Sequence, residues 1–436
     1  MLSPAQIPAA VDDALKNTPI VDMHTHLYPP SFGTPMGGKS GKNDPAGLLL
    51  WGVDELLTYH YLVAEVYRIV PANVLPYEQF WKMSKRQQAD HIWKHLFVER
   101  APISEACRGV LTSVQKLGLD PSDPTPARWR EFCESQDPSE YIDRVMQASN
   151  VKSITMTNAI FDDNERKRWL DNPKVGNDKR FTTVLRMDPM LRNWPVAASR
   201  LSEWGYPATP EPNAASIESA KKFLRDWLDR MNAIYMALSL PPEFRYPAPG
   251  DDVVARAGQT ILEKAILPVC AERKIPFAMM IGSRLRVNPS LNDAGDMGGV
   301  ADVMSVVNLC RDFPQNRFFV TMLARENQHE LAVAARKFGN LMVFGCWWFL
   351  NNPVLIEEIT RMRIELLGTT FIPQHSDARV LDQLLYKWEH SRRIIGKVLA
   401  EKFIDQASAG RPPSKADIEK TVKLFVADNF ETFRKG

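Results

Sequence analysis

The sequence is poor in the features that mark several large protein classes. Its five cysteines lie far apart and form no Cys-x-x-Cys pair, so neither a disulfide framework nor a zinc knuckle is predicted. No apolar run approaches the ~20 residues of a membrane span, and the first residues lack the pattern of a signal peptide. Lysine and arginine total 54 against 52 acidic residues, which gives no electrostatic reason to expect nucleic acid. These absences predict a cytoplasmic protein with neither a membrane nor a nucleic-acid partner.

The chain also lacks a glycine-rich phosphate loop of the GxGxxG or GxxxxGK[ST] type. What it contains is a series of short apolar runs with amphipathic, helical patterns between several of them. The candidate strands are Pro19–Met23, Val151–Thr157, Thr182–Met187, Ile234–Leu238, Pro276–Ile281, Arg317–Leu323, Leu341–Phe349 and Thr370–Pro373. Strands that alternate with helices predict a parallel sheet, and eight of them favour a closed (β/α)8 barrel.

The chain divides into three parts by pattern. Residues 1–26 hold a short N-terminal helix and the first barrel strand. Residues 27–150 open with a loop rich in glycine, proline and serine and continue as helical patterns, at 53–69, 77–97 and 103–117. We expect this part to be a mostly helical insertion after the first strand. Residues 151–436 supply the remainder of the barrel and C-terminal helices.

His24 and His26 form the strongest local signal. They follow the apolar run that ends at Met23, and residues two apart in a strand point to the same side. The two imidazoles can therefore face one divalent ion at the C-terminal end of the strand, where barrel active sites lie. The alternative is two unrelated loop histidines, since an HxH pair also occurs by chance.

Asp377 and Arg379 follow the last candidate strand. Asp377 can supply an oxygen ligand or act as a base, and Arg379 can point to the same barrel mouth. The alternative is that Asp377 only caps the helix that follows. Because the eighth strand of a closed barrel adjoins the first, the pair His24 and His26 favours the site interpretation.

Aromatic residues supply further candidates. Trp347 and Trp348 end the seventh strand and are able to line a pocket or stack on a sugar face, although burial in the core is an even alternative. Tyr59 and Tyr61 lie in the helical insertion. Either tyrosine would serve as an acid or base at the mouth, and simple burial with a satisfied hydroxyl is equally compatible with the pattern.

Three arginines fall at strand ends, namely Arg186, Arg284 and Arg325. A guanidinium group binds a carboxylate through two parallel hydrogen bonds, so these side chains are candidates for holding an acidic substrate. Surface salt bridges are the alternative for at least one of them.

Short islands spread in order through the whole chain carry a family resemblance. They are IVDMHTHL, DELLTYHYL, VLRMD, IGSRLRVNP, LARENQ, FGCWWFLNN, SDARV and WEHSRRII. In these islands the sequence resembles uronate isomerase (glucuronate isomerase), a member of the amidohydrolase superfamily. The WWF and SDAR islands are fairly specific to this family, whereas the HxH alone indicates only the superfamily.

The resemblance implies a distorted (β/α)8 TIM barrel of the amidohydrolase type with one divalent metal, zinc ahead of manganese. It implies interconversion of D-glucuronate with D-fructuronate and of D-galacturonate with D-tagaturonate. By the same resemblance His24, His26 and Asp377 take the metal positions, and Arg186 meets the carboxylate of the sugar acid. A homo-oligomer is compatible with such an enzyme.

The same resemblance places Arg379 beside the substrate and Tyr59 or Tyr61 at its reacting end. Aldose–ketose isomerisation moves a proton between C2 and C1 and needs a base there, for which Asp377 is our choice. Arg284, Arg325, Trp347 and Trp348 complete the expected substrate site.

The sequence departs from the family at two points. Met280 stands where the family usually has a histidine on the fifth strand, and the insertion motif differs around its tyrosine. One alternative is therefore another enzyme of the superfamily, a hydrolase, decarboxylase or hydratase acting on a small carboxylic acid. A second alternative is a non-catalytic sugar-acid binder, which the HxH and Asp377 disfavour.

Overall fold

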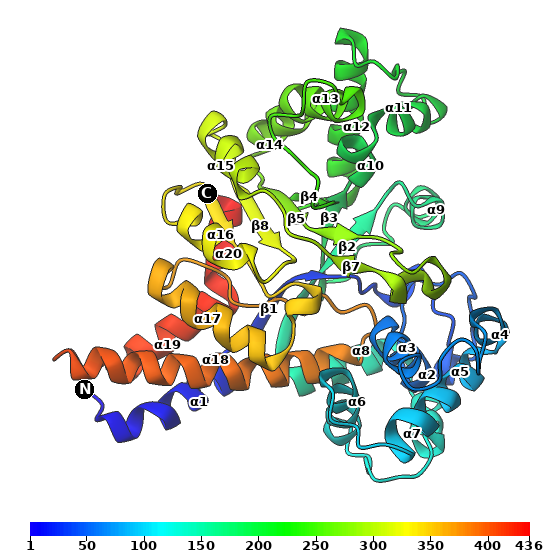
Figure 1. The fold of residues 1–436 in the computed structure, drawn as a ribbon, viewed down its shortest axis with the longest axis vertical. Coiled ribbons are helices and arrows are strands. Elements are labelled where there is room, and N and C mark those ends of the chain that lie inside the picture. The colour runs from blue at the N-terminus through cyan, green and yellow to red at the C-terminus, as the bar shows by residue number, and fades with distance from the viewer.

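A parallel β-sheet that curls toward a barrel forms the centre of the protein. The computed structural model describes residues Met1–Gly436. The strand order of the sheet is β1-β2-β3-β4-β5-β8-β9, and each strand is hydrogen-bonded to the next in this order (Figure 1). All six pairs are parallel. The strands are β1 Ile20–Thr25, β2 Val151–Ala159, β3 Phe181–Arg186, β4 Met236–Leu240, β5 Phe277–Ile281, β8 Phe318–Met322 and β9 Leu341–Val343.

Helices connect the strands and cover the outside of the sheet, as a parallel arrangement requires. They are α9 Asp163–Asp171, α10 Asp188–Arg192, α11 Trp194–Glu203, α12 Ala214–Met231, α13 Val253–Ile261, α14 Leu267–Arg273, α15 Val303–Asp312, α16 Asn327–Ala335 and α17 Pro353–Leu367. Several begin at an aspartate or asparagine whose side chain accepts a hydrogen bond from the first turn, including Asp162, Asn213, Asp252, Asp302 and Asn352.

The eighth predicted strand is not formed, so that prediction is wrong for Thr370–Pro373. Only an isolated bridge joins Ile372 to Phe344, because Pro373 has no N–H with which to extend the pairing. The seventh predicted strand stops at Val343, since Gly345 has a positive φ of 64° that turns the chain. An extended segment thus occupies the place of the eighth strand, and the expected distorted (β/α)8 barrel is confirmed.

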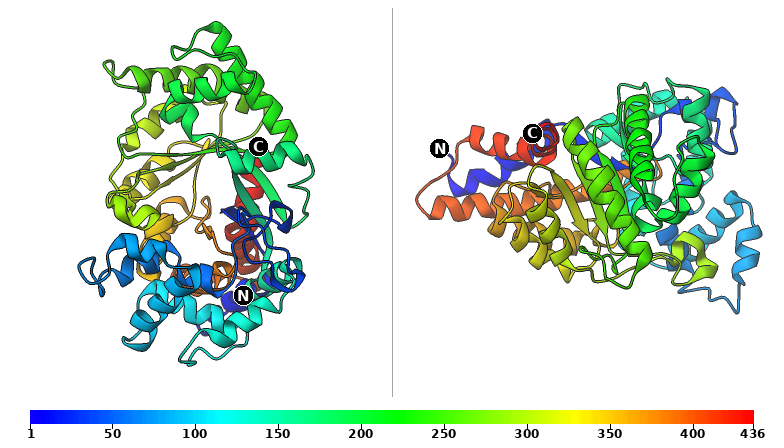
Figure 2. Two further views of the ribbon diagram at one scale, coloured as in Figure 1. Left: turned by 90° about the vertical axis from the view of Figure 1, so that its right-hand side faces the viewer. Right: turned by 90° about the horizontal axis from the view of Figure 1, so that it is seen from above.

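The segment 27–150 is mostly helical and lies at one end of the molecule, opposite helices α10–α14 (Figures 1 and 2). Its helical pattern over 53–69 is broken at Tyr59, whose extended backbone (ψ 142°) separates two short helices. The helices are α2 Val53–Leu57, α3 His60–Val66, α4 Tyr77–Lys82, α5 Lys85–Trp93, α6 Glu105–Lys116, α7 Ala127–Glu134 and α8 Pro138–Ser149. Tyr59 is therefore held at the start of α3 and not inside a helix.

The two ends of the chain pack together. Helix α18, Gln383–Ser408, lies against α1, Ile7–Asn17, and also against α6, α8 and α17 (Figure 1). The chain finishes with α19 Lys415–Lys423 and α20 Asn429–Lys435. None of the helices combines the length and apolar character that a bilayer crossing needs.

The connection from β5 to α15 crosses toward the insertion. It forms a small antiparallel hairpin of β6 Ser283–Arg284 and β7 Met297–Gly298. At its tip the Trp81 indole of α4 donates to the Ser290 carbonyl at 2.8 Å. This connection thereby helps to frame the mouth of the barrel.

Candidate active site

The first strand and the segment that replaces the eighth strand meet at the barrel mouth. The backbone N–H of Asp377 donates to the His24 carbonyl at 3.1 Å, and the His26 N–H donates to the Ala378 carbonyl at 2.7 Å. Asp377 has a positive φ of 52°, an uncommon conformation for aspartate. It does not cap the next helix, which begins at Gln383. This pairing places the side chains of two distant chain segments in one site.

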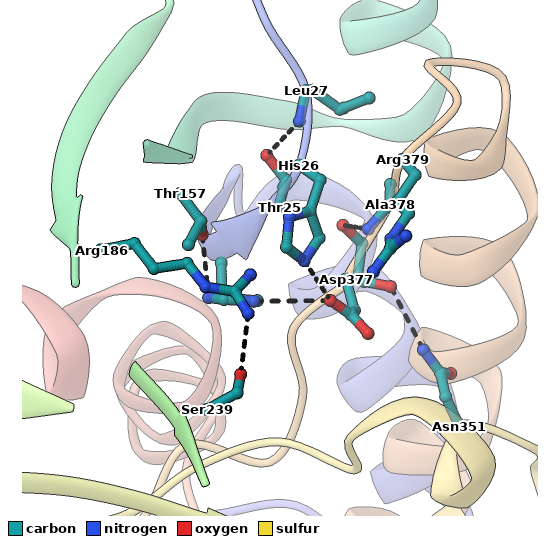
Figure 3. Close-up of polar contacts among 12 residues, drawn as sticks. Thr25, His26, Leu27, Thr157, Arg186, Ser239, Asn351, Asp377, Ala378 and Arg379 are labelled. Atoms are coloured by element: carbon teal, nitrogen blue, oxygen red, sulfur yellow. Dashed lines mark hydrogen bonds and ion pairs between the residues drawn. The ribbon is translucent and has the colours of Figure 1, made fainter. Parts of the chain in front are cut away.

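Three side chains converge there. Asp377 Oδ1 lies 3.4 Å from His24 Nε2 and 3.3 Å from His26 Nε2. Figure 3 shows the side chains of His26 and Asp377 facing each other. The three ligand atoms all lie within 4.8 Å of one another. His24 Nε2 and Asp377 Oδ1 are buried and have no hydrogen-bond partner. Two imidazoles and one carboxylate with such unpaired atoms fit a divalent ion that keeps open positions.

Neighbouring groups orient these side chains for binding. Thr157 Oγ1, from β2, lies 3.1 Å from His24 Nδ1, which leaves Nε2 free to face the cluster. Burial lowers the pKa of His26 to about 3, so its ring is neutral. Burial raises the pKa of Asp377, but contact with the two histidines outweighs this and holds it well below the usual range. Neutral imidazoles and an ionised carboxylate are the forms that bind a metal.

Asp22, on β1, helps to hold the two segments in register. Its Oδ1 accepts the backbone N–H of Ser376 at 3.2 Å, and its Oδ2 accepts the indole N–H of Trp388, on α18, at 2.8 Å. The side chain is fully buried, and burial raises the pKa of this carboxyl. Asp22 therefore joins β1, the Asp377 segment and the long C-terminal helix.

A cavity of about 130 Å³ opens at this cluster. Its wall contains eight of the residues expected from the sequence and eight others. The expected ones are His24, His26, Tyr59, Arg186, Trp347, Trp348, Asp377 and Arg379, and the others are His60, Asp188, Arg192, Ser239, Met280, Ser283, Leu285 and Asp296.

The structure separates the two candidate tyrosines. Tyr59 lines the cavity, whereas Tyr61 does not, and the hydroxyl of Tyr61 is buried without a hydrogen-bond partner. Burial raises the pKa of the Tyr59 phenol, so it stays protonated. His60, between them, also lines the cavity, and its ring lies 5.6 Å from that of Trp348.

The four candidate arginines lie in different places. Arg186 and Arg379 line the cavity. Arg284 does not, since it is 46% exposed and pairs with Glu243 at 3.0 Å. Arg325 is 58% exposed and pairs with a glutamate of α17, also at 3.0 Å. The last two are surface salt bridges, which was the alternative interpretation of their sequence positions.

The two tryptophans are buried in the wall formed by the chain after β9. Trp348 has a positive φ of 49°, and its indole N–H is buried without a partner. Gly345 precedes them with a positive φ, and a Cβ there would lie 1.8 Å from His375 Nδ1. This tight turn aims the tryptophans at the cavity.

Sequence reasoning missed half of the cavity wall. Arg192, Ser239 and Asp296 carry no motif, and only the folded chain brings them to the mouth. Asp188 had a weak signal, since it follows Arg186 by two residues in the VLRMD island. His60 lies between Tyr59 and Tyr61, and the sequence pattern assigned a role only to these two tyrosines.

The sequence matches no family model and no curated protein. Among solved structures, it is similar to a uronate isomerase from Bacillus halodurans, with 49% identity, a TM-score of 0.92, and coverage of 99% of this chain and 97% of the other. A uronate isomerase from Thermotoga maritima shares the fold at 15% identity and TM-score 0.76, over 98% of this chain and 97% of its own. A glucuronate isomerase from Caulobacter crescentus also shares the fold, at 16% identity and TM-score 0.70, over 99% of this chain and 94% of its own.

A metal-dependent hydrolase fold from Lactobacillus casei is a more distant match, with a TM-score of 0.58 at 11% identity. These likenesses agree with the amidohydrolase type of barrel predicted from the sequence. The near-complete coverage at 49% identity decides the family. The chain belongs to the uronate isomerase family and is an enzyme of the aldose–ketose isomerase class.

Proposed function

We propose that this protein interconverts an aldohexuronate, D-glucuronate or D-galacturonate, and its 2-keto isomer. The observation that carries the proposal is the convergence of the ligand atoms of His24, His26 and Asp377, two of them buried and unpaired, in a cavity that Tyr59 and Arg379 also line. A protonated phenol, a carboxylate and a guanidinium group around one polar pocket suit proton transfer on a sugar acid.

His24, His26 and Asp377 would hold one divalent ion in this proposal. We infer zinc ahead of manganese, because two imidazoles and one carboxylate are common zinc ligands. When bound, the ion polarises carbonyl and hydroxyl oxygens of the substrate. His24 is oriented for this task by Thr157, as described above.

The protein side chains would carry the proton transfer. Asp377 takes the proton from C2 of the open-chain aldose, and the same proton is returned to C1, which gives the ketose. The hydroxyl proton of O2 leaves as O1 gains one, so no atom is lost or gained overall. Tyr59, which burial keeps protonated, donates a hydrogen bond at O1, where negative charge develops. Arg379 lies beside it and favours the same charge.

The cavity walls would hold the rest of the sugar. Trp347 and Trp348 present indole surface to the carbon chain. Arg186 presents its free Nη1 to a substrate oxygen, since its Nε and Nη2 are bound to Asp188 and Ser239. Fixing the substrate in this way lowers the entropic part of the barrier.

Hydrolysis is supported less well. Hydrolases of this superfamily commonly use further ligands on the fourth to sixth strands, and Met280 contributes only a thioether from the fifth strand. Ser239, on the fourth strand, is occupied by Arg186. The walls therefore offer shape and hydrogen bonds for a sugar acid more than ligands for a second ion.

Proton NMR in D2O with a panel of uronates tests the proposal. Ketouronate formation that is lost on chelation and restored by zinc is the expected result. A metal-loaded, folded protein that neither converts nor exchanges any uronate would exclude it.

The cytoplasmic location and a homo-oligomeric state also belong to the proposal. The cytoplasmic location is supported by five buried free thiols. Light scattering checks the homo-oligomeric state.

A further inference from the structure

We propose that Arg192 is the anchor for the distal carboxylate (C6) of the substrate. This inference rests on the proposed function and assigns a specificity-determining residue to the same site. It follows from the charges of the cavity wall, where three arginines occur and only one has no partner in the protein.

Arg186, at the end of β3, is already neutralised. Its Nε lies 3.1 and 3.0 Å from the two carboxylate oxygens of Asp188, and its Nη2 lies 2.7 Å from Oδ2. Asp188 is fixed in turn by the backbone N–H of Ser239 at 2.9 Å. A substrate carboxylate placed here would meet the charge of Asp188 as well as that of Arg186. This ion pair is therefore part of the cavity wall and is a poor binding site for an anion.

Arg379 belongs to the reacting end of the cavity. It is two residues from Asp377, and its Nη1 makes a long contact of 3.4 Å with Asp293 on the β5–α15 connection. Asp296, on the same connection, is a further carboxylate in the wall. This arginine is thus placed to act near C1 and C2, beside Tyr59.

Arg192 differs from both. It is half-buried, forms no salt bridge and donates no side-chain hydrogen bond within the protein. It is the last residue of α10, which packs against β4 and α13, so its backbone is fixed. It lines the catalytic cavity and also an adjoining cavity of about 280 Å³. Arg192 consequently lies between the two cavities.

Neither carboxylate of the second cavity, Glu243 or Asp252, forms a salt bridge with Arg192. Glu243 is engaged by Arg284 at 3.0 Å, and Asp252 accepts the N–H of Ala255 as the cap of α13. Arg245 donates to backbone carbonyls of its own loop. Arg192 is therefore the one arginine of the catalytic cavity without an ion pair, and a carboxylate is the partner that its planar fork prefers.

Two ligands that differ only at C6 test the assignment directly. D-Glucarate has a carboxylate at C6 and D-gluconate has a hydroxymethyl group, so the ratio of their dissociation constants, measured by calorimetry, isolates the C6 contact. A charge-assisted hydrogen bond contributes about 1.5–3 kcal/mol, which is roughly a 10- to 150-fold preference for glucarate. We expect Arg192→Met to abolish this preference and leave gluconate affinity unchanged. Arg192→Lys should retain part of it.

The control is Arg325→Met, the same substitution at an exposed salt bridge remote from the cavity, which should leave both affinities unchanged. In kinetics, Arg192→Met should raise KM for the uronate by the same factor. Thermal unfolding and Arg192→Gln guard against a folding defect. A wild-type protein without preference for glucarate, or a folded Arg192→Met that keeps it, overturns the inference. If the preference is lost in the variant but no uronate is isomerised by the wild type, the anchor stands and the proposed reaction fails.

Discussion

Thr157→Val removes one hydroxyl that the metal cluster depends on. Thr157 Oγ1 lies 3.1 Å from His24 Nδ1, deep in the barrel. For Nε2 to bind an ion, Nδ1 must carry the ring proton, and this N–H then donates a hydrogen bond to Thr157 Oγ1. Valine fills nearly the same volume but offers no acceptor, so the ring loses its tautomer preference and its orientation. We expect metal affinity to fall while the barrel still folds.

The size of the effect follows from these contacts. Loss of a hydrogen bond to a ligand histidine weakens metal binding by about 10- to 100-fold, which is about 1.4–2.8 kcal/mol. At a free metal concentration of 100 times the wild-type Kd, binding stabilises the native state by about 2.7 kcal/mol. A 30-fold weaker site leaves about 0.9 kcal/mol of that stabilisation. The buried Nδ1 also costs the metal-free protein about 1–3 kcal/mol.

Competition with a chromophoric chelator measures the Kd, and urea unfolding at fixed free zinc measures the stabilisation. Thr182→Val is the matched control, because it removes a hydroxyl that donates to Thr155 at 3.0 Å on the neighbouring strand, away from the cluster. Equal metal affinity in Thr157→Val and wild type would refute the reasoning. An equal loss of metal affinity in Thr157→Val and Thr182→Val would refute it as well.

Three further perturbations have defined outcomes. Asp377→Asn should lower kcat by at least about 10²-fold while far-UV circular dichroism stays native, and turnover near the wild-type rate would contradict its role as base. Gly345→Ala should have a free energy of unfolding in urea more than about 2 kcal/mol lower than that of Gly118→Ala, because only the former Cβ would meet a side chain, 1.8 Å from His375 Nδ1. Burial raises the pKa of Glu105 from 4.5 to about 7. Its contribution to stability is therefore complete below pH 4.5 and lost as pH rises to about 7. Glu105→Gln should remove this decline of up to about 3 kcal/mol, and an unchanged pH–stability profile would contradict it.

The local pattern of the first strand was sufficient to predict two of the three residues of the metal cluster. His24 and His26 lie two residues apart after a buried run, so the strand period alone orients both rings to one side. Asp377 required the additional idea of a closed barrel, since only closure brings residue 377 to the first strand. The seven strands were predictable from their continuous apolar runs, because parallel strands are buried on both faces.

The parts that sequence reasoning missed depend on backbone turns and side-chain direction. Pro373 and the positive φ of Asp377 replace the last strand by an extended segment, which an apolar run alone does not reveal. Arg284 follows a buried strand but lies on an exposed hairpin, so its position at a strand end did not indicate its direction. Arg192 carries no motif, and its role depends on charges that only folding brings near it.

The seam between β1 and the Asp377 segment has a consequence for biosynthesis. The two histidines leave the ribosome early, but their carboxylate partner lies about 350 positions later, and α18 must follow before Trp388 can bind Asp22. During translation the growing polypeptide therefore has an open barrel and an incomplete set of ligands. Metal loading must wait until nearly all of the chain has been synthesised, so tight metal retention reports that the last segment has joined the first.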